Sequence, residues 1–142
     1  MSLTIALFGA GGKMGCRITD NLRRTSHRMH YVEINPLGIG RLRERGLSLT
    51  DHETAVREAD IAVLALPDAI IGKVAPTVVP GLKPGAMVIC LDPAAPYAGE
   101  LPACEHVSYF VTHPCHPPVV SDEVDPAARR DFFGAIKAKQ NI

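Results

Sequence analysis

Residues 4–15 read Thr-Ile-Ala-Leu-Phe-Gly-Ala-Gly-Gly-Lys-Met-Gly, an apolar run followed at once by a cluster of glycines. The apolar run is typical of a buried strand, and the residues after it have the spacing of an amphipathic helix. Small residues in a strand-to-helix turn let the backbone approach a pyrophosphate, which N–H groups at the helix N-terminus then bind. A glycine cluster alone also fits a plain tight turn. Its place between strand and helix favours a dinucleotide site, with Gly15 where the helix packs close to the sheet. The predicted cofactor-binding residues here are Gly9, Ala10, Gly11, Gly12, Lys13, Met14 and Gly15.

Strand-like and helix-like segments alternate along the chain, which is the pattern of a parallel sheet covered by helices. Strands are predicted at residues 4–8, 29–34, 47–49, 61–66, 86–91 and 107–112. Helices are predicted directly after the glycines, at about 38–45, at 53–58, at 69–79 with Asp68 as cap and a bend or early end at Pro76, and after Asp125-Pro126. The fold class is therefore α/β, with a doubly wound, mostly parallel Rossmann-type sheet in one domain over residues 1–142. Residues 135–142 resemble the start of a strand, so we expect the chain to be a fragment or truncated form of a two-domain protein.

Composition excludes several classes of partner. The 142 residues are 46% hydrophobic, and 15 basic residues balance 15 acidic ones, so neither a nucleic-acid surface nor an anionic membrane surface is expected. The apolar runs are too short to span a bilayer. Four cysteines in no regular framework indicate a reducing compartment, which favours the cytoplasm.

Glu33 follows the second predicted strand, 18 positions after Gly15. An acid at this place accepts hydrogen bonds from the adenosine ribose and repels a 2′-phosphate, so it favours NAD over NADP. The alternative is a solvated carboxylate at a strand end. Arg41 and Arg43 are near enough in sequence to keep NADP as an alternative cofactor.

Ligands of parallel sheets bind beyond the carboxyl ends of the strands. The loops after residues 61–66 and 86–91 should therefore contact the cofactor through their backbone. These loops contribute Leu66, Pro67, Asp68 and Asp92 to the predicted cofactor-binding residues. Ending a strand or capping a helix would explain Pro67 and Asp68 equally well.

Two histidines lie in the proline-rich segment His113-Pro-Cys-His-Pro-Pro118, just after the last predicted strand. Imidazole suits a base that takes a hydroxyl proton as hydride leaves the carbon, so His113 and His116 are the candidate catalytic residues. The alternative is a rigid loop whose histidines bond only backbone. A zinc site is not favoured, because Cys104-x-His106 and His113-x-Cys115 are spaced more tightly than usual zinc ligands. Cys16 and Cys90 fit small core residues better than nucleophiles.

These motifs resemble the superfamily of 6-phosphogluconate dehydrogenase-like and β-hydroxyacid dehydrogenases, in which a cofactor domain precedes an all-helical domain. The Met-Gly before residue 16 is typical of that superfamily, and Ala65-Leu-Pro67 is similar to its cofactor loop. Asp92-Pro-Ala-Ala95 stands where β-hydroxyacid dehydrogenases carry Asp-x-Ser-Thr. The segment from His113 instead resembles the His-Pro-Met-x-Gly-Pro loop of prephenate dehydrogenases, whose catalytic histidine would fall on His113, although Cys115 and Pro117 depart from it.

Over nearly its whole length the chain is similar to a bacterial phosphogluconate dehydrogenase-like group. Five motifs carry this resemblance, and they begin at Gly9, Ala65, Ala94, His113 and Asp125. The group includes D-apionate oxidoisomerase, an NAD-dependent enzyme that oxidises and rearranges a branched sugar acid. The resemblance implies an NAD-dependent dehydrogenase of a small hydroxy acid or sugar acid, a homodimer in the full-length protein, and further substrate groups on a helical domain. The alternatives are a prephenate dehydrogenase-like oxidoreductase and a non-enzymatic nucleotide-sensing domain.

Overall fold

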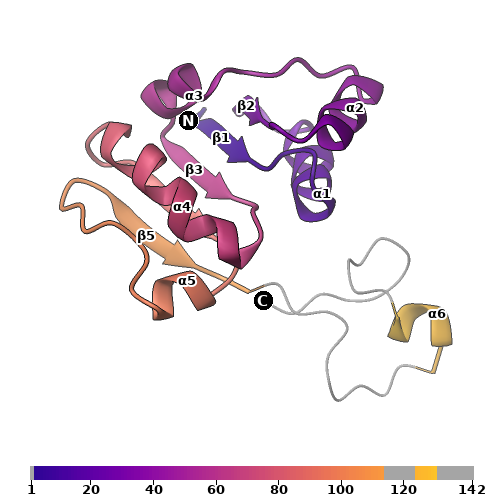
Figure 1. Cartoon of the computed structure of the whole chain (residues 1–142). Coiled ribbons are helices and arrows are strands. Elements are labelled where there is room, and N and C mark those ends of the chain that lie inside the picture. The colour runs from indigo at the N-terminus through magenta and orange to yellow at the C-terminus, as the bar shows by residue number, and fades with distance from the viewer. Residues whose placement is uncertain (1, 114–123, 131–142) are drawn as a thin grey trace.

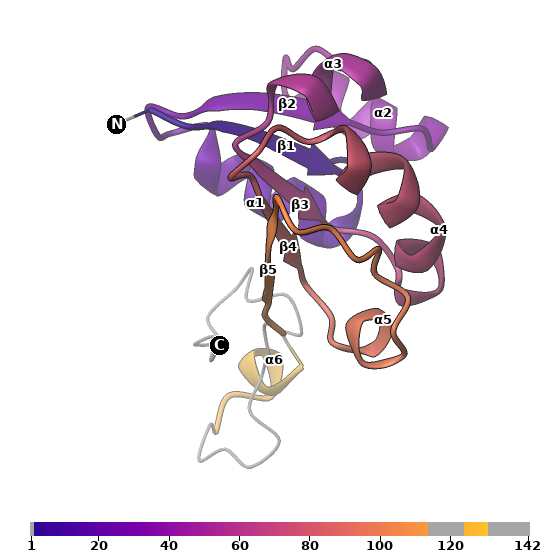
Figure 2. The same cartoon turned by 90° about the vertical axis from the view of Figure 1, so that its left-hand side faces the viewer.

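The computed structural model describes residues 2–113 and 124–130, and within them five parallel strands form one sheet with helices on both faces (Figures 1 and 2). Their order across the sheet is β2-β1-β3-β4-β5. The α/β, doubly wound fold expected from the sequence is confirmed. The strands are β1 (Thr4–Phe8), β2 (Arg28–Val32), β3 (Ile61–Leu64), β4 (Met87–Cys90) and β5 (Ser108–Val111).

The strand order reverses at β1. The chain passes from β1 to β2 on one side, and β3 then pairs with the other side of β1. In open parallel sheets, ligands bind beyond the carboxyl ends of the strands at such a reversal. The glycine-rich segment leaves the carboxyl end of β1, so the fold places it at this point.

Helices cover the two faces of the sheet through two separate apolar clusters. Because side chains alternate along a strand, Ile5 and Leu7 of β1 pack in one cluster, whereas Ala6 and Phe8 pack in the other. The first cluster includes residues of α1 and α2, and the second includes residues of α3, α4 and α5. The helices are α1 (Lys13–Leu22), α2 (Pro36–Glu44), α3 (His52–Glu58), α4 (Asp68–Val78), α5 (Ala94–Tyr97) and α6 (Pro126–Arg129).

Side-chain caps start three of these helices. The side chains of Asn35, Asp51 and Asp125 each accept a hydrogen bond from a backbone N–H in the first turn of α2, α3 and α6. The short helix expected after Asp125-Pro126 is thus confirmed. Helix α1 begins differently, because its cap position is occupied by Gly12, which has no side chain to cap the first turn.

The structure corrects several element predictions. Residues 47–49 form no strand but part of the connection from α2 to α3, where Leu47 packs against the α1 and α2 face and Thr50 N–H donates to the Tyr31 carbonyl. Asp68 does not cap α4, because Pro67 is the cap residue and no side chain bonds the first turn. Helix α4 also continues past Pro76 to Val78, and a 3-10 turn (Val79–Gly81) follows. Helix α2 begins at Pro36, earlier than predicted, and α5 was not predicted.

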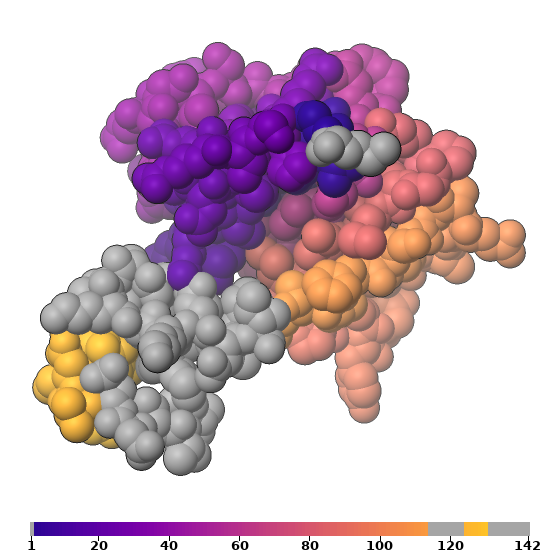
Figure 3. Space-filling model, turned by 180° about the vertical axis from the view of Figure 1, so that it is seen from behind, coloured from indigo at the N-terminus to yellow at the C-terminus, as the bar shows by residue number. Residues whose placement is uncertain are grey.

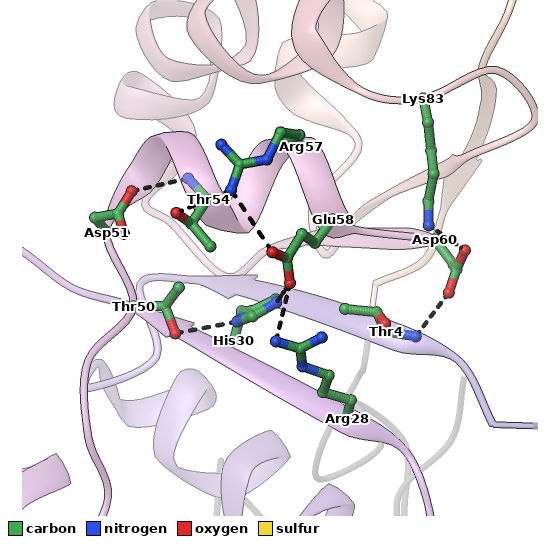
Figure 4. A network of polar contacts seen from close by, with 10 residues as sticks. All are labelled: Thr4, Arg28, His30, Thr50, Asp51, Thr54, Arg57, Glu58, Asp60 and Lys83. Atoms are coloured by element: carbon green, nitrogen blue, oxygen red, sulfur yellow. Dashed lines mark hydrogen bonds and ion pairs between the residues drawn. The ribbon is translucent and has the colours of Figure 1, made fainter.

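A polar network joins β2, α3 and the amino ends of β1 and β3 (Figure 4). His30 is only 5% exposed, and its two ring nitrogens each lie 3.1 Å from an oxygen, Thr50 Oγ1 on one side and Glu58 Oε2 on the other. Near the amino end of β3, Asp60 accepts a hydrogen bond from Thr4 N–H and pairs with the Lys83 ammonium at 2.7 Å. This network lies at the end of the sheet opposite the glycine-rich segment and was not anticipated from the sequence.

β5 forms one edge of the sheet and reaches the molecular surface (orange in Figure 3). Phe110 is 51% exposed and Val111 is 39% exposed. The carboxyl end of β5 continues through Thr112, whose N–H donates to the Cys90 carbonyl of β4. The two strands therefore stay paired up to the segment that contains His113.

Candidate functional site

The glycine-rich turn is closely packed against β3 and α2. Gly9 has φ +77°, and a Cβ there would collide with the carbonyl oxygen of Ala65 just after β3. A Cβ on Gly15 would collide with the Gly9 carbonyl oxygen, so α1 lies directly against the turn. The predicted role of Gly15 in close helix packing agrees with this contact.

Gly11 and Gly12 have different surroundings. A Cβ on Gly11 would collide with the backbone of Gly38 in α2, so its small size is needed for packing within the protein. A Cβ on Gly12 would approach only the Gly9 carbonyl oxygen, at 3.2 Å, and the more distant Ala65 oxygen. Gly12 therefore lies at the open side of the turn, and its N–H donates to the Gly9 carbonyl oxygen at 3.0 Å.

Glu33 connects the end of β2 with the glycine-rich turn. Its Oε2 accepts a hydrogen bond from Gly11 N–H at 2.9 Å, and its Oε1 accepts from Ile34 and Asn35 N–H, also at 2.9 Å. Gly38 lies so close that a Cβ there would contact the Glu33 carboxyl at 2.6 Å. Glu33 thus holds a carboxylate beside the turn, where the sequence predicted it. The packing role of Gly38 was missed, and no pattern in the sequence distinguishes it from Gly40.

Three adjoining cavities run along the carboxyl ends of the strands. The first, of about 300 Å³, lies over the glycine-rich turn and is also lined by Glu33, Arg41, Leu66 and Pro67. The second lies beside Glu33 and is mostly apolar. Its lining residues are Phe8, Gly9, Val32, Glu33, Ile34, His52, Leu66, Val74 and Thr77. The third also has a volume of about 300 Å³, and its lining residues are Gly12, Lys13, Met14, Ala65, Leu66, Pro67, Asp68, Leu91, Asp92 and His113.

The cavities bring together most of the predicted site residues that the structure describes. Leu66 lines all three cavities, and Gly12 joins the first to the third. Ala10 and Gly15 line none of them and are buried, so they support the turn from within. His116 lies outside the described residues.

Two apolar residues beside Glu33 were not singled out in the sequence. Ile34 is 91% exposed and Leu37 is 73% exposed, yet both line the cavities next to the carboxylate. Apolar surface of this kind suits a flat aromatic group. The signal available in the sequence was an apolar residue directly after the acid at a strand end.

Arg41 lies in the same cavity as Glu33. Its Nη1 donates to the Gly11 carbonyl oxygen at 3.0 Å, so its guanidinium lies near the place expected for the adenosine ribose. Arg43 lines none of the three cavities. Of the two arginines that keep NADP as an alternative, the structure thus brings only Arg41 to the site.

Asp92 and His113 meet in the third cavity. Asp92 Oδ2 lies 3.2 Å from His113 Nδ1, and Asp92 Oδ1 accepts a hydrogen bond from Ala94 N–H at 2.8 Å. The Asp92 side chain is 23% exposed and that of His113 is 53% exposed. From the sequence the two residues were predicted to have separate roles, and their pairing was not anticipated.

Cys104 and His106 pair with each other and line none of the three cavities. Cys104 Sγ lies 3.2 Å from His106 Nδ1, and His106 Nε2 lies 3.1 Å from the Leu82 carbonyl oxygen. Residues 2–113 and 124–130 contain no group of three metal-ligating side chains, and Cys115 lies outside that range. Cys16 and Cys90 are buried as expected, and burial raises the pKa of the Cys90 thiol.

The arrangement fits a dinucleotide. A helix N-terminus without a side-chain cap opens at the carboxyl edge of the sheet and suits a phosphate. A carboxylate on one side suits ribose hydroxyls, and the apolar cavity beside it suits an adenine ring. On the other side, an imidazole paired with a carboxylate could exchange a proton with a small substrate.

No protein-family model matches the chain. In an alignment of 143 positions that covers all of this chain, it is 51% identical to a protein of Cupriavidus necator named D-apionate oxidoisomerase, and it covers 52% of that protein. A protein of the same name from Rhizobium rhizogenes is 50% identical over 97% of this chain, which covers 50% of that relative. The chain thus spans about half the length of the curated relatives it matches.

Solved structures share the fold. A crystal structure from Cupriavidus necator, described as a semialdehyde dehydrogenase NAD-binding protein in complex with calcium and NAD, superposes with a TM-score of 0.84. It is 51% identical over 99% of this chain, which covers 51% of that chain. The 3-hydroxyisobutyrate dehydrogenase of Mycobacterium tuberculosis has a TM-score of 0.65 at 19% identity, over 80% of this chain and 41% of its own.

Within the described residues, no helix is both long enough and apolar enough to cross a bilayer. The expected resemblance is confirmed at the level of homology, since the alignments with these relatives cover 97% to 100% of this chain. The chain is a homologue of proteins named D-apionate oxidoisomerase across about half of their length, and it has the Rossmann fold found in hydroxyacid dehydrogenase-like proteins.

Proposed function

We propose that this chain is the cofactor domain of an NAD-dependent oxidoreductase that acts on a small hydroxy acid or sugar acid, with D-apionate as the first substrate to test. The observation that carries the proposal is the row of three cavities at the carboxyl edge of the sheet. The likeness to a protein solved with NAD, at 51% identity, supports the choice of cofactor.

In this proposal the cofactor-binding residues have distinct roles. The first turn of α1, which starts after Gly12, binds the pyrophosphate through its backbone N–H groups. Glu33 accepts hydrogen bonds from the adenosine ribose, and Ile34 lies along the adenine ring. Leu66, Pro67 and Met14 line the path from the pyrophosphate to the third cavity.

The substrate would lie in the third cavity beside His113. Bound NAD supplies the acceptor for the hydride that leaves the carbinol carbon. His113 takes the proton of the substrate hydroxyl, and the hydroxyl oxygen becomes the carbonyl oxygen of the product. His116 remains the second candidate for this role. Further substrate groups and homodimer contacts would come from other parts of the whole protein.

The two alternative functions explain fewer of these observations than an NAD-dependent oxidoreductase of a small acid does. A prephenate dehydrogenase-like activity rests only on the similarity of one loop, whereas relatives that match this chain at 37% to 51% identity carry another name. A non-enzymatic nucleotide sensor would use the glycine turn and Glu33, but it gives no role to an aspartate–histidine pair in the adjoining cavity.

A direct test uses the whole protein and follows NADH formation with D-apionate and with a panel of other small hydroxy acids. We expect NAD-dependent oxidation of D-apionate at a rate well above that of simple hydroxy acids. NAD binding without oxidation of any acid in the panel would favour the sensor. Oxidation of prephenate in preference to sugar acids would favour the other dehydrogenase.

A further inference from the structure

The pairing of β4 with β5 places Asp92 opposite His113. The last paired residues in the two strands are Cys90 and Val111, and the hydrogen bond from Thr112 N–H to the Cys90 carbonyl extends the pairing. Two positions beyond this register pair, the chain carries Asp92 on one side and His113 on the other. The parallel sheet itself therefore sets their separation, although they are 21 positions apart in sequence.

Asp92 is held in place on its other side as well. Its Oδ1 accepts a hydrogen bond from Ala94 N–H, the first residue of α5, so the carboxylate bridges a helix start and the imidazole. The contact to His113 is made through Nδ1, so Nε2 is the ring nitrogen that does not contact Asp92. A carboxylate next to Nδ1 favours the tautomer that carries its proton on Nδ1.

We infer that Asp92 is a positioning residue for His113 and fixes the tautomer in which Nε2 is the proton acceptor. This inference rests on the proposed function and changes the role predicted for Asp92, from a cofactor contact to a partner of the base. As His113 takes the substrate proton it becomes a cation, and the adjacent carboxylate stabilises that charge. The atoms balance simply, because the hydroxyl proton moves to Nε2 and the Nδ1 proton stays in place.

The tautomer can be measured without turnover. In the ¹⁵N-labelled whole protein, at mildly alkaline pH where imidazoles are neutral, two-bond ¹H–¹⁵N correlations distinguish Nδ1–H from Nε2–H. The His113 signals are assigned by their loss in His113→Asn. We expect Nδ1–H in the unmodified protein and a shift toward Nε2–H in Asp92→Asn, because the amide NH₂ would donate to Nδ1. An Nε2–H tautomer in the unmodified protein would overturn the inference.

Kinetics provide the second measurement. Asp92→Asn should lower kcat by about 10²-fold or more, a loss of the size expected when a general base is wrongly protonated, and leave the Kd of NAD nearly unchanged. In the His113→Asn background the same change should have little further effect, because the two residues act as a unit. Additive losses, or a loss mainly in NAD affinity, would contradict a role through His113.

Glu105→Gln is the matched control. This exposed carboxylate lies just before the opposite end of β5 and lines none of the three cavities, so its loss should change neither the His113 tautomer nor kcat. If the unmodified protein oxidises no acid, the proposed function fails, and the tautomer measurement still decides whether Asp92 orients His113. The two failures are therefore distinguishable.

Discussion

Glu33 combines a structural role with the role proposed in cofactor choice. Its carboxylate accepts three backbone hydrogen bonds, one of them from Gly11 in the turn. A 2′-phosphate at the adenosine ribose would bring a second negative charge next to this carboxylate, while Arg41 on the same cavity would attract it. In the proposed site, the balance between these two side chains should therefore decide between NAD and NADP.

We expect the protein to bind NAD more tightly than NADP, as measured by isothermal titration with each cofactor. Glu33→Gln removes the charge and keeps an oxygen for the backbone N–H groups, so it should narrow the gap between the two affinities. Glu33→Ala should narrow the gap and also lower the Tm, because three backbone donors lose their acceptor. Equal or tighter NADP binding by the unmodified protein would refute the role of Glu33.

His113 is the residue at which the proposed chemistry can be tested most directly. In the whole protein, His113→Asn should lower turnover by about 10²- to 10⁴-fold, the usual contribution of a general base. NAD affinity should change little, because the predicted pyrophosphate and ribose contacts lie at the glycine turn and Glu33. Unchanged turnover would make His113 an ordinary loop residue and move the test to His116.

At the scale of elements, the glycine turn has one position that matters for packing and another that faces the side from which a ligand would approach. Gly11 faces the backbone of Gly38 in α2, whereas Gly12 faces the open side of the turn. Substitution of Gly11 therefore tests packing, and substitution of Gly12 tests the approach of a ligand.

Gly12→Ala should weaken NAD binding by about tenfold or more, equivalent to about 1.4 kcal/mol, with a small change in Tm. Gly11→Ala should lower the Tm markedly, because its Cβ must displace the backbone of α2. Thermal unfolding and NAD titration of both variants provide the comparison. The same loss of NAD affinity in two equally stable variants would contradict this division.

The sequence predicted the elements that have a strong local signal. The apolar run of β1, the glycines after it and the Asp125-Pro126 helix start are all decided within a few residues. Residues 47–49 look equally strand-like, but no strand pairs with them, and Leu47 packs in the apolar cluster that includes residues of α1 and α2. Helix α5 is only four residues long, and its start depends on the Asp92 carboxylate, so no periodic pattern reveals it.

The same distinction applies to the site. Gly9, Glu33 and His113 follow strands, and the rule that ligands bind at carboxyl ends is enough to nominate them. The Asp92–His113 pair depends on the register between β4 and β5, and the contact of Gly11 with Gly38 depends on how α2 docks. Both are tertiary relations, which a single sequence does not specify.

At the scale of the whole molecule, the two ends of the sheet differ in the groups that they carry. The carboxyl end holds the cavities, while the amino end holds the network around His30 and Asp60 that ties β1, β2, β3 and α3 together (Figure 4). The hydrogen bonds from Lys83 and from Thr4 N–H hold the pKa of Asp60 below its ordinary value, against the opposing effect of burial.

This lowered pKa predicts a pH-dependent contribution to stability. A carboxylate whose pKa is lower in the folded state stabilises that state above the unfolded pKa, and the stabilisation is lost as pH falls through the folded pKa. Asp60→Asn should therefore lower the free energy of unfolding at neutral pH by about 1 kcal/mol or less, since the pair is partly exposed and screened. The difference should begin to shrink as pH falls below about 4, the ordinary pKa of an aspartate, and vanish only below the lower folded pKa. Urea unfolding at neutral pH and in acid checks this, with Glu105→Gln as control, and a difference that persists in acid would contradict it.

The start of α1 has a consequence for the history of such proteins. A serine at position 12 would accept a hydrogen bond from the first turn and stabilise the free chain by a few tenths of a kcal/mol, while its side chain would occupy the place of an incoming phosphate. Where the Gly9 carbonyl oxygen, 3.2 Å from a Cβ at this position, can give way, folding favours serine, whereas binding a phosphate here favours glycine. Among distant descendants of this domain, a capping side chain at position 12 should mark the lineages that have abandoned the dinucleotide.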